Sequence, residues 1–477
     1  MTVEYPVAGQ WTAGTSSRQV LSPFDGSLIA EVPAFSGADV DAAVAAADNA
    51  MATSPLATHE RAAILDRAAQ LLAGRQEDFA YDLAREAAKP LTQARIEVQR
   101  AVSTLTFCAA EARTFTGEMV PMDAAPSGVD HFGFVMRVPI GVVGAISPFN
   151  FPLNLVAHKV GPAIAAGCAV VVKPASQTPL SALNLAKVLF EAGLPMEYLS
   201  VVPGSGGTVG DALVRNPDVA LISFTGSPEV GWGIRAEAPR KRVGLELGNN
   251  SPLIICADGD WKAAAAAVRL AGFSHAGQSC ISTQRILVED SIKDDFVAEL
   301  VRQVSTLVVG DPLADTTEVS ALIDKANTDR VKSWVESATA NGATVAAGGT
   351  VTPEGHLNPT ILMDAQPDDD VCAHEIFGPV VVVRGFTDVA AALAEANDSH
   401  YGLQAAIFTA NINTALWAAK GLDYGGVLIN EVPTWRADHM PYGGLRDSGN
   451  TREGPGWAIR EMTEERLVVI KTGAGPA

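Results

Sequence analysis

Cysteine is scarce in this sequence of 477 residues, with five copies and no pair spaced as CxxC. Cys108, Cys168, Cys256, Cys280 and Cys372 are scattered and odd in number, and no His and Cys spacing resembles a zinc site. This pattern argues against a disulfide framework and against a structural metal, so we predict no metal ligands. Reduced thiols in the cytoplasm are the expected state.

Basic residues are also few: the sequence has 34 Lys and Arg against 54 Asp and Glu, so its formal net charge is −20. Phosphate-rich partners need concentrated cations, so we expect no nucleic-acid partner. The N-terminus has no basic segment leading into an apolar core, so no secretory signal is expected. The sequence therefore predicts a cytoplasmic protein.

A long unbroken apolar run is missing too. The stretch 138–157 has no formal charge, yet Pro139, Pro148, Pro152 and two asparagines interrupt it. We predict a buried strand, a loop and a helix there, and no membrane partner. Low-complexity tracts and repeats with a period of 20–50 residues are also absent, so no repeat architecture is expected.

What the chain does contain is an alternation of helices and strands. Residues 39–111 repeat apolar positions at intervals of three and four, as helices do. Short apolar strands alternate with helices after Arg137, and a second alternation runs from about 251 to 435. This order predicts an α/β fold built on a doubly wound parallel sheet.

One helix has recognisable end signals. The apolar run 169–173 is typical of a parallel strand covered on both faces. We predict that Thr178 caps the helix after it, with Pro179 in the first turn and Gly193 at the end. The segments 122–140 and 466–471 read as strands that lie outside the main sheets.

Three loops are candidates for binding. The glycine-rich run 203–210 invites a dinucleotide-fingerprint interpretation, but no acidic residue follows about twenty positions later, and a plain turn explains it better. In 224–231, Ser227 as N-cap and Pro228 in the first turn would leave backbone N–H groups for an anion, although a capped helix without ligand fits as well. The prolines of 148–152 could hold Asn150 as a donor to an oxyanion, or Asn150 could form an Asx-turn.

The most informative pair is Cys280, in Gly277-Gln278-Ser279-Cys280, and Glu246, in Glu246-Leu247-Gly248. A thiolate attacks carbonyl carbon well, and a nearby carboxylate can activate the water that later releases an acyl group. The pair therefore suggests aldehyde oxidation.

Together these segments resemble the aldehyde dehydrogenase superfamily, in its lactaldehyde and short-chain-aldehyde branch, over essentially the whole chain. The resemblance is specific because seven motifs occur in the family's order: 148–152, 173–176, 224–231, 246–248, 277–280, 375–379 and 441–444.

The resemblance implies a role for each matched residue. Cys280 is the expected nucleophile, whose thiohemiacetal gives up a hydride and becomes a thioester. Asn150 and the Cys280 N–H are the expected oxyanion site, and Glu246 is the expected base for hydrolysis, so a free acid is favoured over transfer to coenzyme A. The resemblance also implies a set of cofactor-binding residues, namely Ser147, Pro148, Phe149, Lys173, Ser176, Gly206, Phe224, Gly226, Ser227, Leu247, Glu375 and Phe377.

Two departures from the family pattern bear on the cofactor and the base. Ser176 stands where many NAD-preferring relatives carry Glu, which removes both the ribose acceptor and the repulsion against a 2′-phosphate. NAD or NADP is therefore expected, with the preference open. Asn249 stands where Gly is usual, close to the base, and could adjust its hydration.

The substrate prediction also comes from the resemblance. Six residues fall at positions that line the aldehyde tunnel, namely Arg100, Phe151, His158, Ser279, Ile281 and Arg436. Two guanidiniums and an imidazole would suit a small hydroxylated or anionic aldehyde, such as lactaldehyde, glyceraldehyde or a semialdehyde. In the alternative, Arg100 is a solvated helix residue and Arg436 pairs with Asp438 or with another subunit. Broad specificity for apolar or aromatic aldehydes also stays open.

The resemblance divides the chain into three parts. Residues 1–121 and 141–250 are expected to form a Rossmann-like NAD(P)-binding domain, and 251–440 a catalytic α/β domain. Residues 122–140 and 460–477 are expected to form an oligomerisation arm, which predicts a homodimer or homotetramer. A binding protein that lost the chemistry and a cofactor-free cysteine hydrolase are the competing classes, and the complete set of Cys280, Glu246 and Asn150 argues against the first.

Overall fold

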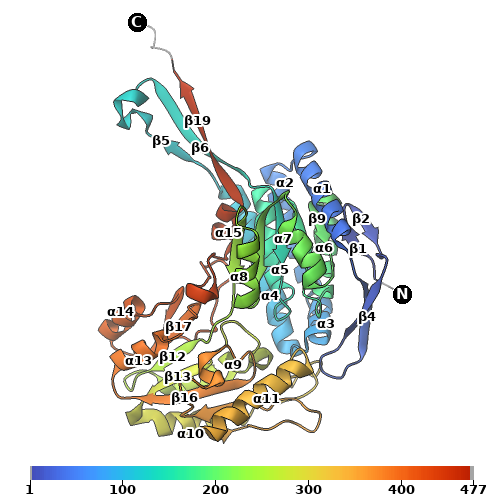
Figure 1. The fold of residues 1–477 in the computed structure, drawn as a ribbon. Coiled ribbons are helices and arrows are strands. Elements are labelled where there is room, and N and C mark those ends of the chain that lie inside the picture. Colours follow the sequence, from blue (N-terminus) through green and yellow to red (C-terminus); the bar gives the residue numbers. More distant parts are fainter. Residues whose placement is uncertain (1–2, 473–477) are drawn as a thin grey trace.

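The computed structural model describes residues 3–472 and consists of two α/β bodies and a projecting arm. In Figure 1 one body holds the N-terminal half of the chain and the other holds most of the C-terminal half. The arm rises from the body that holds the N-terminal half of the chain. No helix in the described part of the chain is both long enough and apolar enough to cross a membrane.

Four helices form the first long segment and confirm the predicted helical region 39–111. They are α1 (Gly37–Thr53), α2 (Thr58–Ala73), α3 (Gln76–Ala87) and α4 (Leu91–Thr114). Two small hairpins precede them, β1 (Tyr5–Val7) with β2 (Gln10–Thr12) and β3 (Ser17–Leu21) with β4 (Leu28–Pro33).

The first main sheet is fully parallel, with the order β11-β10-β7-β8-β9. Its strands are β7 (Val142–Ile146), β8 (Val170–Lys173), β9 (Leu199–Val201), β10 (Val219–Thr225) and β11 (Arg242–Glu246). Its connecting helices are α5 (Asn154–Ala166), α6 (Leu180–Glu191), α7 (Asp211–Arg215) and α8 (Pro228–Glu237). This confirms the predicted strand, loop and helix across 138–157. The loops at the carboxyl ends of these strands are where a doubly wound sheet binds ligands.

The start of α6 differs from the prediction. The helix begins at Leu180, Pro179 is its N-cap, and the buried Thr178 hydroxyl has no partner within the described range 3–472. Glu86 of α3 accepts hydrogen bonds from the Leu180 and Ser181 N–H groups, both at 2.9 Å. The first-turn amides are thus satisfied by a residue far away in sequence, which no local cap signal could reveal.

The second main sheet has the order β14-β15-β16-β13-β12-β17-β18 and is parallel apart from the edge strand β14. Its strands are β12 (Pro252–Ile255), β13 (Arg285–Glu289), β14 (Thr344–Ala347), β15 (Thr360–Met363), β16 (Val380–Phe386), β17 (Gln404–Phe408) and β18 (Gly426–Ile429). Its helices are α9 (Trp261–Ala271), α10 (Lys293–Val304), α11 (Lys325–Ala340), α12 (Asp370–Ala373), α13 (Val389–Asn397) and α14 (Ile412–Gly421). The α/β fold predicted from the sequence is confirmed.

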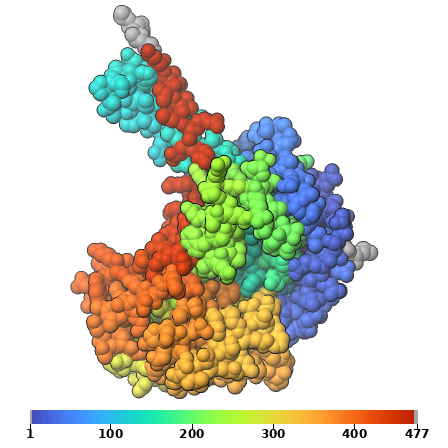
Figure 2. Space-filling model, viewed as in Figure 1, coloured from blue at the N-terminus to red at the C-terminus, as the bar shows by residue number. Residues whose placement is uncertain are grey.

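The arm is a three-stranded antiparallel sheet of β5 (Glu118–Val120), β6 (His131–Pro139) and β19 (Thr463–Lys471), reached from the body through α15 (Pro455–Glu461). Figure 2 shows it standing clear of both bodies. The predicted strand at 466–471 is confirmed, but residues 122–124 and 126–128 are short 3₁₀ turns and only 131–139 of that segment is strand. Residues 473–477 lie outside the described part, and the division into three domains stays a prediction.

Candidate active site

A cavity of about 510 Å³ lies at the carboxyl ends of the first sheet and reaches Cys280 in the second body. Cys280, Glu246 and Asn150 all line it, although they come from three distant segments. The cavity is also lined by eleven of the twelve residues predicted to bind the cofactor: Ser147, Pro148, Phe149, Lys173, Ser176, Phe224, Gly226, Ser227, Leu247, Glu375 and Phe377. The structure therefore brings the predicted nucleophile, base and amide into one cleft with the predicted dinucleotide site.

The loop before Cys280 has little conformational choice. Gly277 has φ +71°, and a Cβ there would lie 2.1 Å from the carbonyl oxygen of Gly378. The Gln278 side chain donates to the His275 carbonyl at 3.1 Å and accepts from the Ile323 N–H at 2.9 Å. The Gly-Gln pair thus fixes the backbone that presents the thiol.

Cys280 Sγ lies 2.9 Å from Tyr442 Oη. Burial raises the pKa of Cys280 to about 12, and the carboxyl groups of Glu375 and Glu246 act in the same direction. The hydrogen bond with Tyr442 and the Arg436 guanidinium act in the opposite direction. The other four cysteines are buried and lie outside this cavity.

Asn150 is held by two hydrogen bonds. Its Nδ2 donates to the Gln278 carbonyl at 3.0 Å, and its Oδ1 accepts from the Phe151 N–H at 3.1 Å. Glu97 of α4 accepts from the Leu153 and Asn154 N–H groups at 3.0 and 3.1 Å, which anchors the loop where α5 begins. One N–H of the Asn150 amide remains for a ligand.

Glu246 is buried at the end of β11, and neither carboxyl oxygen has a hydrogen-bond partner in the described part of the chain. Burial and the nearby Glu453 raise the pKa of Glu246 well above its usual value. A Cβ on Gly443 would lie 2.8 Å from Oε1 of Glu246, so glycine at that position leaves room for the carboxyl group. This carboxyl can take or give a proton without first breaking a hydrogen bond.

Asn249 has a structural role. Its side chain donates to Ser251 at 2.8 Å and to the Gln404 carbonyl at 3.1 Å, and its N–H donates to Glu375 at 3.1 Å. Asn249 is absent from the lining of the 510 Å³ cavity. The suggestion that its side chain adjusts water at Glu246 is therefore not supported.

Polar groups line the predicted cofactor side. Burial lowers the pKa of Lys173 to about 8, and burial raises that of Glu375 to about 7. The Ser147 hydroxyl has no partner among the residues described, and Ser176 donates to the Gly204 carbonyl at 3.1 Å. Ser227 is the N-cap of α8 with Pro228 in the first turn, as predicted.

Gly206 does not join this group. It lies in a short π-helical turn, Gly206–Gly210, and does not line the cavity. The Ser205 side chain accepts from the Thr208 N–H at 3.1 Å and caps this turn. The plain-turn interpretation of 203–210 agrees with this geometry.

A second cavity of about 60 Å³ continues from Cys280 toward Arg100, Phe151 and Arg436. Ser279 and Ile281 also line it, so five of the six predicted substrate residues meet there. A third cavity of about 170 Å³ follows, which shares Arg100, Phe151, Ser279 and Thr434 with the second and adds Lys89 and His275. The three cavities form a path from the cofactor side through Cys280 to an outer chamber.

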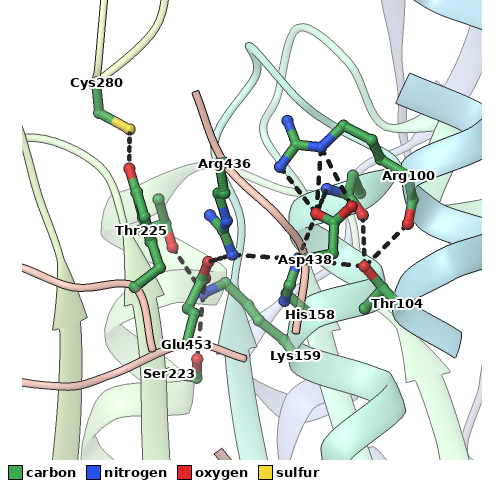
Figure 3. A network of polar contacts seen from close by, with 12 residues as sticks. Arg100, Thr104, His158, Lys159, Ser223, Thr225, Cys280, Arg436, Asp438 and Glu453 are labelled. Atoms are coloured by element: carbon green, nitrogen blue, oxygen red, sulfur yellow. Dashed lines mark hydrogen bonds and ion pairs between the residues drawn. The ribbon is translucent and has the colours of Figure 1, made fainter. Parts of the chain in front are cut away.

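Both arginines in this path are paired with carboxylates (Figure 3). Arg100 donates to Asp438 at 2.8 Å, and its side chain is 24% exposed. Arg436 donates to Glu453 at 2.9 Å, and its side chain is 4% exposed. The alternative in which Arg436 pairs with Asp438 is wrong, because Asp438 forms its ion pair with Arg100 and Arg436 forms one with Glu453.

His158 lies behind this path and lines none of the three cavities. Its Nε2 lies 3.2 Å from Asp438, Thr104 and the Arg436 guanidinium. Burial and the Arg436 charge lower the pKa of His158, so the imidazole is neutral. The geometry places it as a support for Arg436 and Asp438.

Three residues of the site were given no role in the sequence reasoning, namely Lys159, Tyr442 and Glu453, and Asp438 was considered only as a partner of Arg436. Lys159 donates to Thr225 at 2.7 Å and to Ser223 at 3.1 Å, and it lies 4.0 Å from Glu453 (Figure 3). Tyr442 stood in one of the seven motifs, so that motif was the available signal. For Lys159 and Glu453 no local pattern distinguished them from surface charges.

Residues 11–468 match the model of a family described as the aldehyde dehydrogenase family. A 3-sulfolactaldehyde dehydrogenase from Priestia aryabhattai is 43% identical over 464 residues, which cover 97% of this chain and 97% of that protein. A lactaldehyde dehydrogenase from Methanococcus aeolicus is 36% identical over 471 residues, covering 98% of this chain and 99% of that protein.

A solved structure gives a similar result. The crystal structure of a glyceraldehyde-3-phosphate dehydrogenase from Methanocaldococcus jannaschii, complexed with NADP, has a TM-score of 0.92 at 37% identity. The superposition covers 96% of this chain and 99% of that chain.

Proposed function

This chain belongs to the aldehyde dehydrogenase family, and we propose that it oxidises a small hydroxylated aldehyde with an anionic end group to the carboxylic acid, using NAD or NADP. The observation that carries the proposal is the single cavity lined by Cys280, Glu246 and Asn150 together with the expected dinucleotide residues. A protein that had lost the chemistry would have no reason to keep these three groups together.

The polar groups of the 510 Å³ cavity fit a dinucleotide. Lys173 supplies a cation that has no carboxylate partner among residues 3–472, and Ser176, which lines the same cavity, carries no negative charge that would repel a 2′-phosphate. The α8 N-terminus at Ser227 suits the pyrophosphate, and Glu375 suits a ribose hydroxyl pair. The chemistry that the dinucleotide supplies when bound is the acceptance of a hydride.

Cys280 and Asn150 are the groups we assign to the aldehyde carbonyl. The thiolate of Cys280 attacks the carbonyl carbon, and the oxygen becomes negatively charged. The free N–H of the Asn150 amide and the Cys280 backbone N–H, which has no partner among residues 3–472, can both donate to it. Each such preorganised donor lowers the activation barrier by about 3–4 kcal/mol.

Glu246 is the group we assign to hydrolysis of the thioester. Both of its oxygens are free, and it shares the cavity with Cys280. Lys159, Arg436 and Arg452 favour its ionised form, against burial and Glu453. In that form it can take a proton from water as the water attacks the thioester, which makes the enzyme hydrolytic and not coenzyme A-acylating.

The substrate class follows from the outer path and from the relatives. Arg100 lies where the 60 Å³ and 170 Å³ cavities join, and its Nη1 has no partner among the described residues. The aldehydes named by the three relatives all carry a hydroxyl beside the carbonyl, and two of them carry an anionic end group. We assign the hydroxyl to the chamber near Cys280 and the anion to Arg100.

A substrate panel tests the proposal. The purified protein is given 3-sulfolactaldehyde, lactaldehyde, glyceraldehyde 3-phosphate, succinate semialdehyde or butanal, with NAD or NADP, and reduced nicotinamide is followed by absorbance. We expect the highest kcat/KM with an anionic hydroxyaldehyde and the lowest with butanal. Cys280→Ser should abolish turnover and keep dinucleotide binding, while Cys256→Ser, remote from the cavity, should keep both. Equal rates on butanal would favour broad specificity, and turnover by Cys280→Ser would remove the proposed mechanism.

We further propose that the arm joins subunits into a dimer or a dimer of dimers in the cytoplasm. Met119, Leu467 and Ile470 are large apolar side chains about half or more exposed on its strands, where a partner would cover them. All five cysteines are free thiols, and the chemistry needs a reduced Cys280, which suits a reducing compartment. Light scattering tests the assembly, and a monomeric mass at micromolar concentration would contradict it.

A further inference from the structure

The Tyr442 phenol is the one hydrogen-bonding partner of the Cys280 thiol within residues 3–472, at 2.9 Å. Both groups line the 60 Å³ cavity, where Glu246 and Arg436 also lie. The role proposed for Cys280 does not by itself require a phenol. A phenylalanine would fill the same space, so the hydroxyl needs its own explanation.

The phenol is held firmly. Tyr442 forms two backbone hydrogen bonds with Glu453, at 3.1 and 2.6 Å. The Arg436 guanidinium carbon lies 3.8 Å from the centre of the Tyr442 ring, and Arg436 is itself fixed by its ion pair with Glu453. Figure 3 shows Arg436 and its ion pair with Glu453. The backbone pairing and the guanidinium over the ring therefore hold the hydroxyl where it lies 2.9 Å from the sulfur.

Once the Cys280 thiol ionises, the phenol is the donor of the pair, because a thiolate has no proton to donate. Burial and the adjacent Cys280 raise the pKa of Tyr442 well above 10, and Glu246 acts in the same direction while Arg436 opposes it. The titratable groups facing Cys280 are Tyr442, Glu375, Arg436 and Glu246. A guanidinium over the ring face draws electron density from the phenol and strengthens its O–H as a donor.

We propose that Tyr442 is a positioning residue for the nucleophile, whose O–H donates to the Cys280 thiolate, stabilises it and holds Sγ facing the cavity. This rests on the proposed function of Cys280. In the ionisation step the S–H bond breaks, the proton leaves to solvent, and Tyr442 keeps its own proton. A hydrogen bond to a charged group is worth about 1.5–3 kcal/mol, which corresponds to about one to two pKa units on the thiol.

The test is the pH profile of Cys280 alkylation by iodoacetamide in the full-length protein, read at the Cys280 peptide by mass spectrometry. Tyr442→Phe keeps the ring and its contact with Arg436 and removes one oxygen atom. We expect the midpoint of the alkylation profile to rise by about one to two pH units. Alkylation of Cys280 should then slow about ten- to hundredfold at any pH below the midpoint. Tyr424→Phe is the matched control, because its buried phenol bonds to Ala396 at 2.6 Å, away from the cavity, and its profile should not move.

A second variant keeps the test decisive if Tyr442→Phe fails to fold. Replacing Tyr442 by 2,3-difluorotyrosine keeps the ring and the hydroxyl and makes the O–H a stronger donor, so the midpoint of the alkylation profile should fall. An unchanged midpoint in either variant overturns the proposal. The proposal is also overturned if the alkylation profile is normal and kcat/KM falls for hydroxylated aldehydes only. Tyr442 would then bind substrate. Alkylation needs no aldehyde. If the midpoint shifted but the protein turned over no aldehyde, the proposed function would be contradicted while the role of Tyr442 would stand.

Discussion

Arg100 and Asp438 form an ion pair at 2.8 Å between helix α4 and the segment before Tyr442. The same carboxylate accepts from Asn154 and contacts His158, each at 3.2 Å. This pair joins residues 338 positions apart and holds Arg100, which lines the path to Cys280.

The first prediction concerns acid stability. Burial acts to raise the pKa of Asp438, but His158 and Arg100 outweigh it and hold that pKa well below its usual value. A lowered folded-state pKa stabilises the fold above the unfolded-state pKa of about 4, and this contribution is lost as the pH falls below it. Asp438→Asn should therefore lose about 1–3 kcal/mol at pH 7, and its difference from the parent should narrow as the pH falls below about 4.

Urea unfolding at pH 7, 5, 4 and 3 measures this difference. Asp329→Asn is the control, since its pair with Lys325 is exposed and should change stability by less than about 0.5 kcal/mol. A stability difference that is the same at every pH would contradict the prediction.

Arg100→Leu should change substrate selection. Loss of a charge-assisted hydrogen bond is worth about 1.5–3 kcal/mol, so kcat/KM for anionic aldehydes should fall about 10- to 150-fold relative to neutral ones. Arg95→Leu on the same helix is the matched control, because Arg95 pairs with Glu77 and Asp315 and lines none of the cavities. Equal losses on lactaldehyde and 3-sulfolactaldehyde would refute an anion site at Arg100.

Asn150→Ala should lower kcat by about 10²–10³ because one donor to the developing oxyanion is lost, while dinucleotide affinity stays the same. Steady-state kinetics and nucleotide titration measure the two quantities. Asn216→Ala, remote from the cavity with its amide on Asp41, should leave kcat unchanged. A normal kcat in Asn150→Ala would leave the amide with a structural role only.

Glu246→Gln should slow acyl release by about 10²–10⁴, the usual worth of a general base, and leave acylation intact. Intact-protein mass spectrometry should then find the acyl group on Cys280 during turnover. Because the pKa of Glu246 is raised, acyl release in the parent should speed up with rising pH above the ordinary carboxylate range. Glu229→Gln, in the first turn of α8, is the control and should show no adduct. Rapid release in Glu246→Gln would place the base elsewhere.

Ser176→Glu should turn the enzyme toward NAD. A carboxylate there would repel a 2′-phosphate and accept from ribose hydroxyls, so KM for NADP should rise at least about tenfold while KM for NAD holds or falls. The ratio of kcat/KM for the two nucleotides is the measurement. If that ratio did not move, Ser176 would lie away from the adenine ribose.

Much of this site was predictable because the chemistry requires local motifs. The family resemblance is confirmed by the match over residues 11–468, and the motif around Cys280 needs a Gly at 277 to pack against Gly378. The α/β order followed from apolar periodicity alone. These signals are local or repeat along the chain, so they can be read without coordinates.

The misses share a physical cause, which is contact between distant segments. Glu86 caps α6, Glu453 pairs with Arg436, and Asp438 pairs with Arg100, and none of these partners is near the other in sequence. His158 was expected in the tunnel from the family resemblance, yet its ring lies behind Arg436. Long-range polar pairing decides such cases, and periodicity does not encode it.

Gly277 and Gly378 touch so closely that not even a methyl group fits between them. The loop that carries the nucleophile therefore rests directly on the loop that carries Glu375, three residues before Gly378. In a close-packed interior such neighbours cannot slide independently. A backbone displacement of the loop that carries Glu375 would therefore press on the loop that carries Cys280.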